Sequence, residues 1–145
     1  MVPARILVVD DTSDVLTLVC RVLEGQGYQV LAASDGNAAM AACERVRGEI
    51  DLLLTDIRMP GMNGVELAGS LVAAYPEVRV LFISGQCEES EIPVLVSEKG
   101  FGFVPKPFLP HVLLDAVHGM LPSGRKPVQK AAQSGSMNDV LERIG

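Results

Sequence analysis

The sequence lacks several features that mark common classes of protein. Its three cysteines, Cys20, Cys43 and Cys87, are odd in number and form no CxxC pair, which argues against a disulfide scaffold and against a zinc site. No stretch approaches the roughly 20 consecutive apolar residues that a membrane span needs. The chain does not open with a charged segment followed by an apolar one, as a signal peptide does. We therefore expect a cytoplasmic protein with no membrane partner.

Positive charge is also scarce. Twelve Lys and Arg residues face eighteen Asp and Glu residues, and the net charge of −6 argues against direct binding of nucleic acid. Neither a GxGxxG sequence nor a Gly-rich P-loop is present, so nothing indicates a nucleotide site. The 145 residues are 48% hydrophobic, which suits one globular domain with a substantial core.

The most informative segment is residues 52–64, with the sequence LLLTDIRMPGMNG. An apolar run there ends in a single acid, Asp56, and then in Pro, Gly and Asn residues that cannot continue a strand. Such a run is typical of a buried strand in a parallel sheet. Asp56 would then lie at the carboxyl end of the strand, where open α/β sheets bind ligands. Taken alone, an acid at such a position is better explained as a helix cap than as a site residue.

The same pattern of strand followed by helix recurs along the chain. Strands are expected at 6–9, 28–32, 52–55, 79–83 and 101–104, with helices at 12–25, 37–46, 63–75, 88–99 and 109–120. This alternation predicts an α/β fold, a doubly wound (βα)5 arrangement in which a five-stranded parallel sheet carries helices on both faces.

Two of these helices carry more detailed predictions. Asn63 is expected to cap the third helix, with Glu66 completing a capping box. The inner face of that helix is predicted to be Val65, Ala68, Leu71 and Val72. The last helix is predicted to have an apolar stripe of Leu109, Val112, Leu113, Ala116, Val117 and Met120.

Polar residues follow four of the predicted strands. Because parallel strands end at one edge of the sheet, the following residues should converge there: Asp10, Asp11, Asp56, Ser84 and Lys106. Crowded carboxylates favour a hard divalent cation, and Mg²⁺ prefers oxygen ligands together with a phosphate. With an ammonium and a hydroxyl added, the site complements a phosphoryl group. Neither His111 nor His118 is expected near this edge, and both are predicted to lie on the surface.

These residues, in this order and spacing over residues 4–121, resemble the receiver domain of two-component response regulators. The resemblance implies a flavodoxin-like fold with strand order 2-1-3-4-5. It also implies that Asp56 is the phosphoacceptor, which takes a phosphoryl group from the phosphohistidine of a sensor histidine kinase or histidine phosphotransfer protein. Asp11 resembles the direct metal ligand, Asp10 a ligand through water, and the Arg58 backbone carbonyl a third source of oxygen for Mg²⁺.

The resemblance assigns the remaining site residues as well. Lys106 should pair with the acceptor and phosphoryl oxygens, and Ser84 matches the hydroxyl residue that moves toward the phosphate. Phe103 matches the aromatic switch residue, although simple core packing explains it too. The bond between Lys106 and Pro107 is expected to be cis. The downstream partner should bind the face formed by the fourth helix, the fifth strand and the fifth helix.

One residue departs from the receiver pattern, and a segment of different composition follows the domain. Pro93 lies inside the expected fourth helix, where it removes a backbone donor, so this helix should start late or have a loose first turn. Residues 1–122 are expected to form the receiver domain, and 123–145 a flexible tail that can form a short helix over 136–144. Residues 1–122 carry eight Lys and Arg against sixteen Asp and Glu (net −8), whereas the tail carries four against two (net +2).

Two other functions stay open at this point. One is a Mg²⁺-dependent phosphohydrolase in which Asp56 forms an aspartyl-phosphate that is turned over, although Arg58 stands where such an enzyme usually has a second acid. The other is a degenerate receiver that binds partners without phosphate. Turnover of a small phosphate ester would identify the first, and failure to be phosphorylated would identify the second.

Overall fold

The computed structural model of the chain describes residues 3–85 and 100–121. Several features named above lie outside these residues: the helix expected at 88–99 with Pro93, Cys87, and the tail 123–145 with its expected helix. Within the described residues, no helix is both long enough and apolar enough to cross a membrane.

The centre of the fold is a five-stranded parallel sheet. Its strands are β1 (Arg5–Val9), β2 (Gln29–Ala33), β3 (Leu52–Asp56), β4 (Arg79–Ser84) and β5 (Gly102–Pro105). They are ordered β2-β1-β3-β4-β5, and every neighbouring pair is parallel. The order reverses direction at β1, between β2 and β3, so the chain is doubly wound. The predicted fold class and strand order are confirmed.

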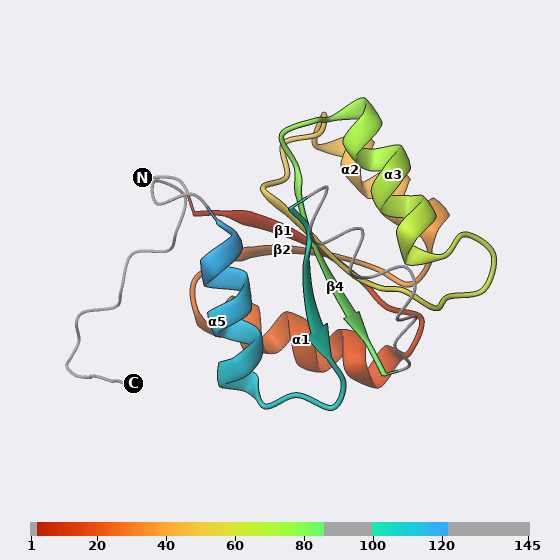
Figure 1. Cartoon of the computed structure of the whole chain (residues 1–145). Coiled ribbons are helices and arrows are strands. Elements are labelled where there is room, and N and C mark those ends of the chain that lie inside the picture. Colours follow the sequence, from red (N-terminus) through yellow and green to blue (C-terminus); the bar gives the residue numbers. More distant parts are fainter. Residues whose placement is uncertain (1–2, 86–99, 122–145) are drawn as a thin grey trace.

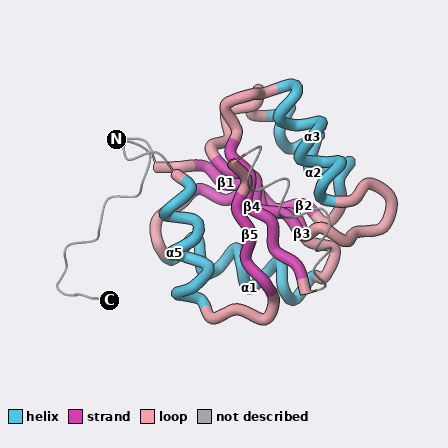
Figure 2. The backbone as a smooth tube through the Cα atoms, in the orientation of Figure 1, coloured by secondary structure: helices cyan, strands magenta, loops and turns pink. Residues whose placement is uncertain are grey.

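Helices cover both faces of this sheet (Figures 1 and 2). They are α1 (Ser13–Gly25), α2 (Gly36–Arg45), α3 (Gly64–Ala74) and α5 (Pro110–Met120). In Figure 1, α1 and α5 lie on one side of the strands, and α2 and α3 lie on the other. Each pair packs with the sheet into its own apolar cluster, one holding Val19 and Leu113 and the other Ala39 and Leu67.

The central strand β3 shows why both layers are needed. All five of its residues are buried. Leu52 and Leu54 pack into the cluster under α1 and α5, whereas Leu53 packs into the cluster under α2 and α3. Since side chains alternate across a strand, a strand covered on both faces reads as a continuous apolar run. The apolar run ends at Leu54, and the last two residues of the strand are Thr55 and Asp56.

The predicted helix details are only partly correct. The capping box at α3 is confirmed: Asn63 Oδ1 accepts from Glu66 N at 2.8 Å, and Glu66 Oε1 accepts from Asn63 N at 3.0 Å. Ala68 and Leu71 are buried as expected, but the third buried side chain is Leu67, and Val65 and Val72 are only half-buried. Leu67 fits because it lies four residues before Leu71, on the same helix face.

The apolar stripe of α5 is narrower than predicted. Leu113 and Val117 are buried and Ala116 and Met120 are half-buried, whereas Leu109 is 61% exposed and Val112 is 42% exposed. Leu109 is the N-cap residue, before the first helical turn, and so lies outside the face that the helix turns toward the sheet. The predicted apolar stripe is therefore wrong at Leu109 and Val112, which do not face the sheet.

Candidate functional site

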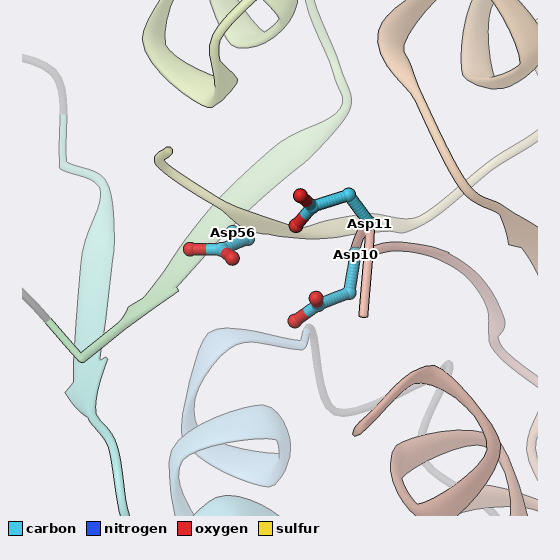
Figure 3. A group of neighbouring side chains, drawn as sticks. All are labelled: Asp10, Asp11 and Asp56. Carbon is cyan, nitrogen blue, oxygen red and sulfur yellow. The ribbon is translucent and has the colours of Figure 1, made fainter. Parts of the chain in front are cut away.

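Three carboxylates meet at the carboxyl edge of the sheet. Asp10 and Asp11 directly follow β1, and Asp56 is the last residue of β3, the strand that pairs with β1. One oxygen from each lies within 4.8 Å of the others. Figure 3 shows Asp10 and Asp11 reaching from the end of β1 toward Asp56. The topology thus brings together acids that are 45 and 46 positions apart in the sequence.

The three acids differ in their access to solvent. Asp10 is fully buried, Asp56 is 7% exposed and Asp11 is exposed. Oxygen ligands in this number suit a hard divalent cation such as Mg²⁺, which keeps several waters and is held by one or two carboxylates. The residues present therefore fit the ion, with Asp11 as its most accessible carboxylate and Asp56 beside it.

A single ammonium group is shared between two of the acids. Lys106 Nζ lies 2.9 Å from Asp10 Oδ2 and 3.2 Å from Asp56 Oδ2. Lys106 follows β5, and its backbone N–H donates to the Ser84 carbonyl at the end of β4 at 2.8 Å. The peptide bond from Lys106 to Pro107 is cis. Lys106 is thereby held at the same edge as the carboxylates.

The pKa values of this pair reflect its burial and its charges. Burial is the largest influence on the pKa of Asp56 and raises it, and the charge of Asp10 raises it further. The charge of Lys106 and a backbone hydrogen bond from Arg58 lower the pKa of Asp56. The net pKa of Asp56 is above its usual value. For Lys106, burial lowers the pKa, but the hydrogen bond to Asp10 and the charges of Asp10 and Asp56 outweigh burial, so its pKa is raised. Lys106 is therefore a firmly held cation at neutral pH.

The loop after β3 fixes the backbone of Asp56. Thr55 Oγ1 donates to the Asp56 carbonyl at 2.8 Å, and Gly64 N donates to the Ile57 carbonyl at 2.7 Å. A Cβ atom on Gly64 would overlap the Asp56 backbone oxygen, so only glycine allows α3 to begin this close to the end of β3.

The other predicted site residues are distributed as follows. Ser84 is the buried last residue of β4, directly opposite Pro105 in the pairing with β5. Phe103 is a half-buried residue of β5 that packs at the border of the apolar cluster under α2 and α3. Arg58 is exposed in the loop after Asp56. His111 and His118 are exposed on α5, in agreement with the prediction that they are surface residues.

One contact was not anticipated from the sequence. Asp10 accepts from the Thr12 backbone N–H through Oδ1 at 2.9 Å and from Lys106 through Oδ2 at 2.9 Å. Asp10 and Lys106 are separated by 96 positions, and an Asp-Asp pair gives no sign of which acid faces the lysine. The strand order places β3 and β4 between β1 and β5, so this contact joins two strands that are not neighbours in the sheet.

A family match, similar sequences and similar solved structures all point to one family of proteins. The response regulator receiver domain family matches residues 6–118. The sensor kinase CckA of Brucella abortus is 35% identical over 118 residues, which cover 81% of this chain and 12% of CckA. The transcriptional regulator NtrC of Azospirillum brasilense is 32% identical over 146 residues, covering 100% of this chain and 30% of NtrC. The chain thus spans less than a third of the length of these curated relatives.

Solved structures show the same fold. The crystal structure of the receiver domain of the hybrid histidine kinase CckA has a TM-score of 0.70 and 35% identity, covering 82% of this chain and 100% of that one. The chemotaxis protein CheY4 of Vibrio cholerae has a TM-score of 0.74 and 27% identity, covering 82% of this chain and 99% of CheY4. A chain of the CheX–CheY–BeF3–Mg²⁺ complex of Borrelia burgdorferi has a TM-score of 0.75 and 25% identity, covering 81% of this chain and 89% of that one.

Proposed function

The chain belongs to the response regulator receiver family of two-component systems, and we propose that it is a phosphoacceptor whose acceptor residue is Asp56. The observation that carries the proposal is the cluster itself: Asp56 ends the central strand, beside Asp11 and within 3.2 Å of the Lys106 ammonium. A nucleophilic carboxylate, a carboxylate for the cation and a fixed positive charge are the groups that phosphoryl transfer requires.

The transfer would proceed by attack of an Asp56 oxygen on the phosphorus of a phosphohistidine. A P–O bond to Asp56 forms, the P–N bond to the donor imidazole breaks, and the donor's histidine leaves with the electron pair and takes up a proton. Asp11, Asp56 and the Arg58 carbonyl would hold Mg²⁺, with Asp10 contacting it through water, and the ion would supply positive charge for the phosphoryl oxygens. Lys106 supplies a second positive charge, and the buried edge keeps these groups in place before the donor arrives.

Phosphorylation would then act as a switch. A phosphoryl group adds up to about two negative charges beside Lys106. Ser84, at the end of the neighbouring strand β4, is the hydroxyl residue that would turn toward the phosphoryl oxygens. Phe103 is on β5 opposite Phe82 and is half-buried, and its ring would change its exposure when Ser84 moves. The switch shifts the balance between two conformations in proportion to the phosphate's preference for one of them.

The partners follow from the same proposal. The donor is a sensor histidine kinase or a histidine phosphotransfer protein, and the downstream partner binds the surface of segment 88–99, β5 and α5. The exposed apolar side chains of the described residues support protein partners on the α1 and α5 side: Leu18, Leu109 and Val112. Leu109 follows Lys106 by three positions, so a protein approaching Asp56 over this edge can contact it. We place the protein in the cytoplasm, where kinases form phosphohistidine from ATP.

The extent of the receiver belongs to the proposal too. The family match ends at residue 118 and α5 ends at Met120, which supports a receiver of residues 1–122 followed by a separate tail. Mg²⁺-dependent self-phosphorylation from small donors and autodephosphorylation are expected of such a domain, but catalytic turnover of other substrates is not.

One experiment separates this function from its two alternatives. The protein is incubated with Mg²⁺ and beryllofluoride, a mimic of the acyl phosphate, and binding is followed by NMR; p-nitrophenyl phosphate turnover is measured in parallel. We expect beryllofluoride to bind only when Mg²⁺ is present, with no sustained release of p-nitrophenol. Sustained turnover would instead indicate a phosphohydrolase, and absence of beryllofluoride binding would indicate a receiver that works without phosphate.

A further inference from the structure

A trough lies along the amino edge of the sheet, at the opposite end of the strands from Asp56. Its volume is about 1220 Å³, which exceeds the roughly 300–1,000 Å³ of typical small-ligand pockets. The lining comes from the starts of several strands and from the turn after α3, and it includes Arg5, Glu49, Asp51, Tyr75, Glu77 and Phe101. A space of this size suits a segment of polypeptide better than a small molecule.

Two aromatic rings give this amino-edge trough a fixed apolar wall. Tyr75 is half-buried, and Gly48 lies so close to its ring that a Cβ atom at Gly48 would overlap it. Phe101 is half-buried too, and its ring meets that of Phe82 edge to face, with 5.8 Å between the centroids and 69° between the planes. Because these neighbours already fix both rings, a ligand would bind them with little loss of side-chain entropy.

The charged residues of the trough are more acidic than basic. They are three acids and two arginines: Glu49, Asp51, Glu77, Arg5 and Arg79. Arg5 is already engaged, because its Nη1 donates to the Glu49 carbonyl at 3.0 Å, whereas the carboxylates of Glu49 and Glu77 are exposed. The trough therefore favours a partner that has positive charge and an apolar face.

Helix α5 ends at the same edge of the sheet. A Cβ atom on Gly102, the first residue of β5, would lie 3.0 Å from the Met120 sulfur. Leu121 is buried in the same apolar cluster as Ala4 and Tyr28, which directly precede β1 and β2. Figure 1 shows α5 running opposite to the strands. The chain therefore leaves the domain at the edge where the trough lies.

Residues 123–145 have the chemistry that the trough favours. Their four basic and two acidic residues give them a net charge of +2, against −8 for residues 1–122. The helix that the sequence predicts over 136–144 would carry an apolar side of Met137, Val140, Leu141 and Ile144. A helix of this length is marginal alone, so it needs an apolar surface to pack against.

We propose that residues 123–145 dock in the amino-edge trough of their own chain, with the apolar side of segment 136–144 against Tyr75 and Phe101. The 15 positions from Leu121 to Ser136 span up to about 50 Å when extended, which exceeds the radius of gyration of about 14 Å expected for the domain. A segment tethered this closely has an effective concentration of about millimolar, so weak docking is enough to fill the trough. Docking leaves the carboxyl edge of the sheet open, so the inference is independent of the proposed function.

NMR of the full chain at low salt tests this contact directly. The chain has two tyrosines and four phenylalanines, so the ring signals of Tyr75 and Phe101 are readily assigned. We expect NOEs from these rings to the methyl groups of Ile144, and their loss in Leu141→Asp. The control Asn138→Asp adds the same charge outside the apolar side and should keep them. Absence of these NOEs in wild type, or their persistence in Leu141→Asp, overturns the inference.

A mixture of isotope-labelled and unlabelled protein identifies the occupant of the trough. Docking within one chain gives no NOEs between labelled and unlabelled copies, and the NOEs within the chain are unchanged on dilution. NOEs that appear only between copies would make the tail of a second copy the occupant, and the inference would be wrong.

Variants of the trough give a second test, because they leave the sequence of the tail unchanged. Ala74 is an exposed residue of the trough lining, and Ala73 is exposed outside it. Ala74→Lys places a long cationic side chain in the trough and should speed amide hydrogen exchange at residues 137–144 by about threefold or more, whereas Ala73→Lys should not. Equal exchange in wild type and both variants overturns the inference. Melting temperatures establish that the variants are folded; should Ala74→Lys fail to fold, the tail variants decide.

Discussion

Gly64 lies against Asp56 so closely that a single added methyl group would overlap the Asp56 backbone oxygen. The start of α3 and the end of β3 are thereby held together, with Gly64 N donating to the Ile57 carbonyl at 2.7 Å. The position of the acceptor carboxylate thus depends on a glycine eight positions later, which has no functional group of its own.

Gly64→Ala is therefore expected to destabilise the protein. Because the added Cβ meets backbone and not a flexible side chain, the loop has to shift, and we expect a loss of about 2 kcal/mol or more in the free energy of unfolding. Urea unfolding measures the change. The matched control is Gly69→Ala on the exposed side of the same helix, where a Cβ meets nothing within 4 Å.

Gly69→Ala should leave stability unchanged or raise it by up to about 1 kcal/mol, since alanine is the better helix former. Equal losses in the two variants would show that helix α3, and not the contact with Asp56, is responsible, and would contradict this account of Gly64.

The raised pKa of Asp56 predicts that its charge destabilises the metal-free fold. Burial is the main cause, so the folded state binds the Asp56 proton more tightly than the unfolded state does. The stability contributed by this proton is complete below the unfolded-state pKa and is lost as pH rises through the folded-state pKa. In EDTA at neutral pH, Asp56→Asn is therefore expected to be more stable than wild type.

Thermal unfolding of both proteins between acid and neutral pH measures this difference, which should shrink toward acid. Asp14→Asn, at an exposed carboxylate in the first turn of α1, is the control and should show no such gain. An Asp56→Asn protein that is less stable than wild type at neutral pH would mean that the ion pair with Lys106 outweighs burial.

Mg²⁺ should stabilise the folded protein through the exposed carboxylate of Asp11. Binding to the folded state alone adds about 1.4 kcal/mol at a concentration tenfold above the dissociation constant. We expect a Mg²⁺-dependent rise in melting temperature for wild type and for Asp14→Asn, and no comparable rise for Asp11→Asn. A full response in Asp11→Asn would remove Asp11 from the metal site.

Ser84→Ala should separate phosphorylation from switching. The variant keeps Asp56, Asp11 and Lys106, so it should still bind beryllofluoride with Mg²⁺. Without the hydroxyl, the change in the environment of Phe103 should be much reduced, as seen in the NMR signals of its ring. Ser70→Ala, at an exposed serine of α3, is the control and should switch like wild type. A full Phe103 response in Ser84→Ala would exclude Ser84 from the switch.

Much of this arrangement could be predicted from the sequence because it depends on local pattern. The run Leu52 to Leu54 reads as a strand buried on both faces, and the place where it ends fixes the position of Asp56. The strand order came from the resemblance to the receiver family, since alternation alone does not decide which strands are neighbours.

Other features could not be predicted, because they depend on contacts between residues that are far apart in the sequence. The hydrogen bond of Lys106 to Asp10 joins positions 96 residues apart, and either acid of the pair could have faced the lysine. The exposure of Leu109 was missed because an apolar residue at helical spacing reads as core even when it precedes the helix. Whether Leu109 is buried depends on the residue at which the first turn of α5 begins.

The central claim is that Asp56 accepts a phosphoryl group in a Mg²⁺-dependent reaction. Intact-mass spectrometry after incubation with acetyl phosphate tests it most directly, with wild type, Asp56→Asn and wild type in EDTA compared side by side. We predict the addition of one phosphoryl group to wild type, and none to the variant or to the chelated sample. Addition to Asp56→Asn to the same extent, or no addition to wild type in Mg²⁺, would contradict the assignment of Asp56 as the phosphoacceptor.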